Sequence, residues 1–259
     1  MADRWNAVRS FALWSLIALI SVLLFWPGLL AALLGGRNGR GAHAWAGMWA
    51  RLVFRLHPSW RLTVEGQEIP AGRPFVIVCN HQSTADIIVT FHLRHQFRFI
   101  SKGSNFRLPF CGWYMRLCGY IPLERASKAS IARCFELARR KLADGISVLF
   151  YPEGTRSRDG SIHPFKPGAF HLAIDSGVDV LPIAVAGTGG LLPKDSYLLS
   201  REVTRCRMII GTPIPVAGLR GEDVAPLAER ARQAIVSLID TPPERAPVPA
   251  SAAPLKEAV

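Results

Sequence analysis

Acidic residues are scarce in this chain. The 259 residues include 19 aspartates and glutamates against 31 lysines and arginines, which gives a formal net charge of +12. A protein this basic is expected to bind anionic partners, such as nucleic acid, anionic lipid, phosphorylated metabolites or an acidic carrier protein. The mean hydropathy is nevertheless positive, at +0.20, which favours a membrane among these partners.

Cysteine is also sparse. The five cysteines are odd in number, and no two of them form a C-x-x-C pair. Most stand in apolar surroundings, so we expect buried thiols in a protein of a reducing compartment. They are Cys79, Cys111, Cys118, Cys134 and Cys206.

Glycine and proline show no period, and charged residues make up only 19% of the chain against 49% hydrophobic residues. This composition excludes a collagen-like, disordered or coiled-coil protein and leaves enough apolar surface for a core. The length allows one full domain with an appendage, or two small domains. Only the tail 241–259, rich in proline and alanine, is expected to be disordered.

One long uncharged run lies near the N-terminus. Residues 11–34 would span about 36 Å as a straight helix, enough to cross a hydrocarbon core of about 30 Å. Pro27-Gly28 is expected to break this helix, so one tilted, kinked span competes with a helical hairpin that dips into one leaflet. A cleaved signal peptide is a further alternative, although the run exceeds the length of an h-region.

A second, amphipathic helix is predicted at 43–57. Two tryptophans and two leucines recur at helical spacing from Trp45, while Arg51 and Arg55 share another face. The pattern is typical of a helix in a headgroup layer, with a helix packed on the core as the alternative. Arginines are more frequent after the apolar run than before it, which predicts an inner (cytoplasmic) membrane protein with its body facing the cytoplasm. We therefore expect membrane-anchoring helices at 1–57 and a catalytic domain at 58–240.

From residue 60 onward, short apolar runs alternate with helical patterns. This alternation over about 180 residues predicts an α/β fold, with a mostly mixed central sheet of about seven strands flanked by helices. Strands are expected at 60–65, 74–79, 97–101, 119–123, 146–151, 179–185 and 203–210, and helices at 84–95, 128–143, 168–176 and 223–239.

The first candidate site follows the apolar strand 74–79. His81 stands where that strand ends, which is where open α/β sheets place their sites, and Asp86 follows in the first turn of the next helix. A carboxylate on one imidazole nitrogen fixes the tautomer and leaves the other nitrogen to take a proton from a substrate hydroxyl. A capping or structural histidine is the alternative, because the H-x-x-x-x-D spacing alone is unspecific.

No nucleophile accompanies His81. The sequence has no G-x-S-x-G elbow, and Ser83 is expected to cap the following helix, so His81 would activate the substrate's own hydroxyl for direct transfer. A metal site built from His81, Asp86, His92 and His95 is a rival hypothesis. Because no H-E-x-x-H or Cys/His ligand set occurs, neither a metal nor a cofactor is expected.

The second candidate is a turn that follows the strand 146–151. Gly154 allows backbone amides to approach an anion, Thr155 adds a hydroxyl, and Arg156 adds a bidentate fork suited to phosphate. Glu153 is expected to orient Arg156 or to accept a substrate hydroxyl. A solvated basic turn is the alternative interpretation.

Two further basic residues follow predicted strands. Lys102 comes after the strand 97–101 and Arg125 after 120–123, so both are expected near the sheet edge that carries His81. Pro182, inside the strand 180–184, cannot donate a ladder hydrogen bond and marks an edge, a bulge or an irregularity beside the site.

These four segments together resemble the four sequence blocks of the 1-acyl-sn-glycerol-3-phosphate acyltransferase family, within the glycerolipid acyltransferases. The matching segments are 80–86, 102–125, 151–157 and 180–184, and the resemblance covers roughly residues 60–215. The departures are mild: Tyr151 replaces the usual phenylalanine, Glu124 stands where aspartate is frequent, and Thr84-Ala85 replaces a bulkier pair.

The resemblance implies a glycerol-3-phosphate acyltransferase-like fold and an acyltransferase that forms phosphatidic acid. His81 would deprotonate the free hydroxyl of a lysophospholipid, which attacks the thioester of acyl-CoA or acyl carrier protein, while Asp86 holds the imidazole. The residues implied in binding the glycerol phosphate are Glu153, Gly154, Thr155 and Arg156, with Lys102 and Arg125 nearby. The family's membrane-binding helices also resemble residues 11–57.

Three alternatives remain open. An acyltransferase for another lysolipid, such as lyso-ornithine lipid, would use the same blocks. An esterase or hydrolase would use water as acceptor. A membrane-anchored nucleic-acid binder should show aromatic residues interleaved on a basic face, which the sequence lacks, so no nucleic-acid partner is expected.

Overall fold

The computed structural model describes residues 2–157, 159–192, 197–199 and 202–242. Within these residues, seven strands form one sheet in the order β1-β7-β6-β2-β5-β3-β4. The sheet is mixed because β6 and β7 are antiparallel, whereas every other neighbouring pair is parallel. The predicted α/β fold is therefore confirmed. The strands are β1 Trp60–Gly66, β2 Val76–Cys79, β3 Phe97–Lys102, β4 Ile121–Leu123, β5 Ser147–Phe150, β6 Val180–Ala186 and β7 Thr204–Ile210.

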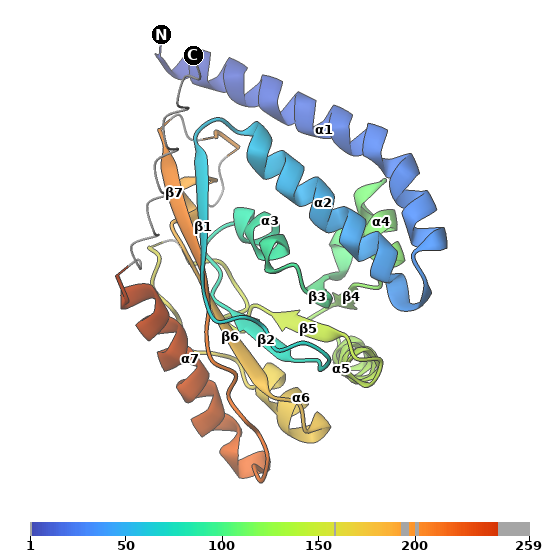
Figure 1. The fold of residues 1–259 in the computed structure, drawn as a ribbon, viewed down its shortest axis with the longest axis vertical. Helices are drawn as coiled ribbons and strands as arrows, with labels where there is room; N and C mark the ends of the chain where they lie inside the picture. Colours follow the sequence, from blue (N-terminus) through green and yellow to red (C-terminus); the bar gives the residue numbers. More distant parts are fainter. Residues whose placement is uncertain (1, 158, 193–196, 200–201, 243–259) are drawn as a thin grey trace, which may run out of the picture.

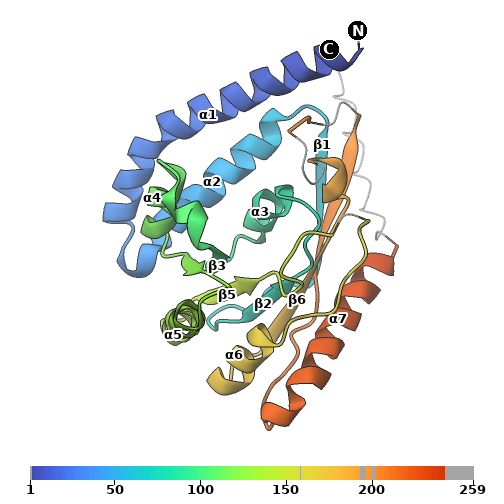
Figure 2. The ribbon, with the colours of Figure 1, turned by 180° about the vertical axis from the view of Figure 1, so that it is seen from behind.

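Helices cover both faces of this sheet (Figures 1 and 2). In β2, Ile77 and Cys79 belong to the core on the side of α2 and α3, while Val76 and Val78 belong to the core under α5, α6 and α7. Because both faces are covered, this strand is apolar throughout instead of alternating. The helices are α1 Ala2–Leu34, α2 Arg40–Leu56, α3 Ala85–Thr90, α4 Cys111–Leu117, α5 Lys128–Ala143, α6 Gly168–Ser176 and α7 Val224–Asp240, with short 3₁₀ turns η1 Arg37–Gly39, η2 Phe91–Leu93, η3 Gly103–Arg107, η4 Thr188–Gly190 and η5 Gly221–Asp223.

Local sequence signals explain the bounds of α5. The Ser127 hydroxyl accepts a hydrogen bond from the Ser130 amide at 3.1 Å and caps the first turn. Cys134, Ala138 and Leu142 recur every fourth residue and are buried in the core. Gly145 adopts a φ of 71° directly after the helix, a left-handed conformation that glycine tolerates best.

Of the two shapes predicted for residues 11–34, the helical hairpin is wrong, because α1 continues through Pro27 to Leu34 as one helix. Proline removes a backbone donor, but side chains of neighbouring helices bind carbonyls on either side of it. Trp45 Nε1 donates to the Leu24 carbonyl at 3.0 Å, and the Tyr114 hydroxyl donates to the Gly28 carbonyl at 3.2 Å. Toward its C-terminal end α1 changes direction and runs down beside α4, as in the kinked alternative (Figure 1).

The second N-terminal helix packs between α1 and the body of the protein. Its buried residues, including Ala50 and Val53, face the core, so the alternative of a core-packed helix describes α2. Trp49 Nε1 donates to the Ser21 hydroxyl of α1 at 3.0 Å, which shows that the tryptophan face meets α1. Only α1, among the described residues, is long and apolar enough to cross a membrane.

Pro182 marks a bulge in the interior of the sheet. Ile183 of β6 is opposite Ile210, and Val180 is opposite Ile214, so two residues on one strand face three on the other. The proline occupies the position where a ladder amide is not required, which agrees with the bulge alternative. Of the tail predicted at 241–259, residues 243–259 lie outside the described part of the chain.

Candidate active site

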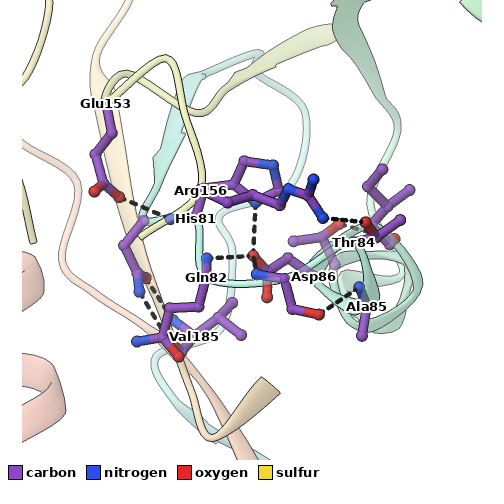
Figure 3. A network of polar contacts seen from close by, with 12 residues as sticks. His81, Gln82, Thr84, Ala85, Asp86, Glu153, Arg156 and Val185 are labelled. Atoms are coloured by element: carbon purple, nitrogen blue, oxygen red, sulfur yellow. Dashed lines mark hydrogen bonds and ion pairs between the residues drawn. The ribbon is translucent and has the colours of Figure 1, made fainter. Parts of the chain in front are cut away.

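The imidazole of His81 and the carboxylate of Asp86 are in direct contact. His81 follows β2, Asp86 lies in the first turn of α3, and His81 Nδ1 lies 2.7 Å from Asp86 Oδ2 (Figure 3). A carboxylate only accepts hydrogen bonds, so Nδ1 carries the proton and Nε2 has the free lone pair. The histidine side chain is 17% exposed and that of Asp86 is fully buried. This geometry gives an accessible base nitrogen oriented by a buried carboxylate.

One oxygen of Asp86 organises the whole turn between β2 and α3. Besides the imidazole, Oδ2 accepts the backbone amides of Gln82 at 2.8 Å and Ser83 at 2.9 Å. The Ser83 hydroxyl accepts the Ala85 amide at 3.1 Å and donates to the Leu192 carbonyl at 2.7 Å. The predicted cap at Ser83 is one residue early, because Thr84 occupies the N-cap position of α3. The carboxylate is therefore held before any substrate arrives.

The loop after β5 holds the backbone of His81 on both sides. Glu153 Oε1 accepts the His81 amide at 2.8 Å, and the Ser157 amide donates to the His81 carbonyl at 2.8 Å. The other oxygen of Glu153 accepts the His163 amide at 3.2 Å. Burial raises the pKa of Glu153, and the two amides partly oppose that shift. Glu153 thus links the two candidate segments through backbone contacts.

Asn80 lies in the matching segment 80–86, but the sequence predicted no role for it. Its side-chain amide donates to the Val185 carbonyl and its carbonyl accepts the Val185 amide, both at 2.8 Å. The side chain therefore replaces a ladder step between the end of β2 and β6. The only signal was an asparagine immediately before the histidine at a strand end.

Arg156 reaches across to the start of α3. One of its terminal nitrogens donates to the Thr84 hydroxyl at 3.0 Å, as Figure 3 shows. Gly154 has a φ of 73°, and a Cβ there would lie 2.8 Å from Lys166 Nζ. Lys166 is thus a second cation at this turn, unnoticed in the sequence because it lies twelve residues after Gly154. Thr155 is exposed on the same turn.

Lys102 and Arg125 lie farther along the same edge of the sheet. Since β2, β5, β3 and β4 are neighbouring parallel strands, their carboxyl ends share one edge. At a spacing of about 4.8 Å per strand, Lys102 and Arg125 are displaced by about 10 and 14 Å from the end of β2. Both side chains are exposed, and neither forms a hydrogen bond or ion pair with His81, Glu153 or Arg156.

The metal hypothesis finds no support in the part of the chain that the structure describes, where no three His, Cys, Asp or Glu side chains form a cluster suited to a metal ion. His92 Nδ1, in η2, lies 3.2 Å from the Ile88 carbonyl of α3. His95 Nε2 pairs with the Ser147 hydroxyl at 2.8 Å. Neither histidine joins the pair formed by His81 and Asp86.

Tyr151 forms the wall against which His81 packs. The two rings are stacked with centroids 4.1 Å apart and an interplanar angle of 19°. The tyrosine hydroxyl is buried without a well-formed hydrogen bond among the described residues. Burial raises the pKa of Tyr151 well above its usual range, so the phenol is neutral.

Tyr151→Phe is expected to keep kcat and to leave the free energy of unfolding unchanged or raise it by up to about 1–3 kcal/mol, because the buried hydroxyl that is removed has only a poorly formed contact with Thr90. Tyr151→Ala, which also removes the ring, is the matched variant and should lower both stability and activity. Urea unfolding and steady-state rates measure the two effects. A large loss of kcat in folded Tyr151→Phe would instead give the hydroxyl a part in the reaction.

Comparisons with known proteins identify the family of this chain. Residues 61–186 match the model of the family described as Acyltransferase. A 1-acyl-sn-glycerol-3-phosphate acyltransferase of Chlamydomonas reinhardtii is 41% identical over 191 residues, covering 72% of this chain and 55% of that protein. The protein of that name from Haemophilus influenzae is 30% identical over 188 residues, covering 70% and 76%.

A crystal structure of the 1-acyl-sn-glycerophosphate acyltransferase from Thermotoga maritima superposes with a TM-score of 0.75 at 25% identity, covering 92% of this chain and 100% of that one. The chain spans about half the length of the algal and plant relatives it matches, 55% and 54%. Its sequence and its fold are those of the acyltransferase family. Within it, the chain belongs to the 1-acyl-sn-glycerol-3-phosphate acyltransferases.

Proposed function

We propose that this protein transfers an acyl chain from a thioester to the free hydroxyl of 1-acyl-sn-glycerol-3-phosphate, which gives phosphatidic acid. The observation that carries the proposal is the 2.7 Å contact between His81 Nδ1 and Asp86 at the carboxyl end of β2, in a chain of this family. The donor is acyl-CoA or acyl carrier protein, and both present anionic surfaces to a chain of net charge +12.

In the proposed reaction His81 Nε2 accepts the proton of the acceptor hydroxyl as its oxygen attacks the thioester carbonyl. Asp86 stabilises the imidazolium that forms, since its carboxylate already accepts the Nδ1 proton. The tetrahedral intermediate then collapses, the carbon–sulfur bond breaks, and the imidazolium returns its proton to the leaving thiolate. The products are the new ester and the free thiol, and no acyl-enzyme is formed.

We assign the phosphate of the acceptor to the turn that carries Arg156. The guanidinium lies on the same side as His81, fixed through Thr84, and Lys166 adds a second positive charge over Gly154. Thr155 contributes a hydroxyl to the turn, and Glu153 acts by positioning the loop. Lys102 and Arg125 extend the positive edge toward β4, where longer anionic groups of either substrate would lie.

The proposal places the protein on the cytoplasmic face of the inner membrane, with residues 1–57 as its anchor. One side of α1 packs on α2, while large apolar side chains on the other side are more than half exposed, including Leu19, Leu23 and Trp26. A surface of this kind is stable only when apolar material covers it. A bilayer meets that need and also holds the lysolipid acceptor.

Arg156→Ala is expected to raise the KM for lysophosphatidic acid by about 10- to 150-fold, because a charge-assisted contact is worth roughly 1.5–3 kcal/mol. The KM for the acyl donor should change little. Arg156→Lys should recover only part of the loss, since an ammonium cannot bind two phosphate oxygens in parallel. Arg140→Ala, at an exposed arginine on α5 that pairs with Glu136, is the matched control and should change neither constant.

A melting curve of each variant separates substrate binding from support of the loop. If Arg156 acts only as a loop support, both KM values should shift together with the melting temperature. An unchanged acceptor KM in well-folded Arg156→Ala would remove this residue from the phosphate site. That result would favour an acceptor without a phosphate, such as lyso-ornithine lipid, and the same assay run with that lipid tests it directly.

A further inference from the structure

A second apolar surface lies beside the C-terminal half of α1. We call it the aromatic ledge and define it by Leu108, Phe110 and Trp113 at the start of α4 together with Trp26 on α1. These side chains are 50%, 42%, 48% and 64% exposed. Exposed single apolar residues are ordinary, but contiguous large ones mark an interaction surface.

Ring contacts join the two parts of the ledge. Phe25 of α1 lies 5.3 Å from Phe110 and 5.5 Å from Trp26, and the rings of Phe110 and Trp113 are 5.2 Å apart. Both views of the fold place α4 against the end of α1 (Figures 1 and 2). The ledge therefore continues the exposed apolar side of α1.

The backbone of the ledge is held in one shape. Phe110 adopts a φ of 57°, which is strained for a bulky residue, and its ring is directed onto Phe25. The Tyr114 hydroxyl donates to the carbonyls of Gly28 and Ala42, both at 3.2 Å. Gly112 cannot accept a side chain, because a Cβ there would lie 2.5 Å from the Phe106 backbone.

We infer that the aromatic ledge is a second bilayer contact, which seats in the headgroup region of an anionic leaflet while α1 provides the anchor. This inference rests on the proposed membrane-bound function and extends it from residues 1–57 to the segment between β3 and β4. Three observations favour a bilayer as the occupant: the surface is continuous with α1, tryptophan is suited to the membrane interface, and two exposed arginines lie beside the ledge in the chain. These are Arg116 and Arg107, of which Arg107 also pairs with Glu124 at 3.5 Å.

The ledge also connects the membrane to the candidate site. β3 ends at Lys102, η3 follows directly, and the ledge begins at Leu108. A bilayer that binds the ledge therefore fixes the distance between the leaflet and the sheet edge that carries Lys102 and Arg125. The lysolipid headgroup would then meet this edge without leaving the membrane surface.

Cys111 offers a reporter in the ledge itself. It is the exposed thiol among the five free cysteines, and the other four are buried. Burial of part of this side chain raises the pKa of its thiol, so labelling is best done at mildly alkaline pH. The full chain, labelled there with an environment-sensitive fluorophore, is placed in vesicles of phosphatidylethanolamine and phosphatidylglycerol that carry nitroxide lipids.

Two comparison chains carry Cys111→Ser and a new cysteine, Leu23→Cys on α1 or Gln233→Cys on α7. We expect the Cys111 probe to be quenched as strongly as the probe at Leu23→Cys. The probe at Gln233→Cys should not be quenched. Quenching at Leu23→Cys alone would overturn the inference that the ledge contacts the bilayer and would leave the membrane proposal intact. Quenching at neither position would overturn both. Without lipid, the emission of the Cys111 probe could shift to the blue as the protein concentration rises. That result would show that a second copy of the chain covers the ledge, and it would also overturn the inference.

Activity gives an independent test. Trp113→Glu should lower the rate severalfold with acceptor in vesicles but not with a short-chain acceptor dissolved below its micelle concentration. Val64→Glu, at a comparably exposed valine on β1, should change neither rate. Equal losses of Trp113→Glu with both acceptors would indicate damage to the fold or site and would contradict a role at the bilayer.

Discussion

His81→Ala is expected to lower kcat by about 10²–10⁴-fold, the usual contribution of a general base, while the protein stays folded. The side chain is 17% exposed, and the backbone amide and carbonyl of residue 81 keep their partners Glu153 and Ser157 in the variant. The melting temperature should therefore change little. Rates at saturating donor and acceptor, together with a melting curve, measure both effects.

The matched control is His171→Ala, which removes an exposed imidazole on α6 far from this turn. Its kcat should equal that of the unmodified protein. If folded His81→Ala kept more than about a tenth of the activity, the loss would be smaller than a general base supplies, and the assignment of the base would be wrong.

The strands of the sheet were predictable because most of them are buried on both faces. An uninterrupted apolar segment such as Val76–Cys79, ended by polar residues, is typical of such a strand. The order of the strands was not predictable in the same way. β1 pairs with β7 across most of the chain length, and that pairing depends on packing between distant segments instead of on any local pattern.

The N-terminal helices show where local rules fail. Pro27 was expected to kink the helix or to turn it back as a hairpin. The helix continues, and Trp45 and Tyr114, which lie on other helices, donate to carbonyls on either side of the proline. Arg98 is a similar case. It lies within β3 with no exposed surface and donates to the carbonyls of Phe97 and Asn38. No sequence pattern predicts this environment for an arginine.

The site was predictable where its chemistry is local and unpredictable where it depends on folding. His81 and Asp86 are five residues apart, so one turn brings them together. Lys166 approaches Gly154 only because the chain returns over the turn, with its amide donating to the Pro152 carbonyl at 2.9 Å. The roles of these residues in catalysis and binding stay predictions that the variants test.

Asp86→Asn is expected to lower kcat by about 10²–10⁴-fold as well, although it keeps the size of the side chain. The carboxylate oxygen Oδ2 accepts three hydrogen bonds, from the imidazole and from the amides of Gln82 and Ser83. An asparagine whose carbonyl takes the place of Oδ2 can accept the same three hydrogen bonds, but it has no negative charge to stabilise the imidazolium that forms in the reaction. Its NH₂ group then takes the place of Oδ1, which is buried without a hydrogen-bond partner among the described residues.

The double variant His81→Ala/Asp86→Asn separates a positioning role from a structural one. If Asp86 acts only through His81, the double variant should be about as slow as His81→Ala alone, because residues that work as a unit are strongly non-additive. If Asp86 mainly supports the turn, the two losses should multiply and the melting temperature should fall in both chains with Asp86→Asn.

A pH–rate profile gives a further readout: with an oriented imidazole as base, the ascending limb should move in Asp86→Asn and stay in place in His171→Ala. Multiplying losses with an unmoved profile would contradict the assignment of Asp86 as the residue that orients the base.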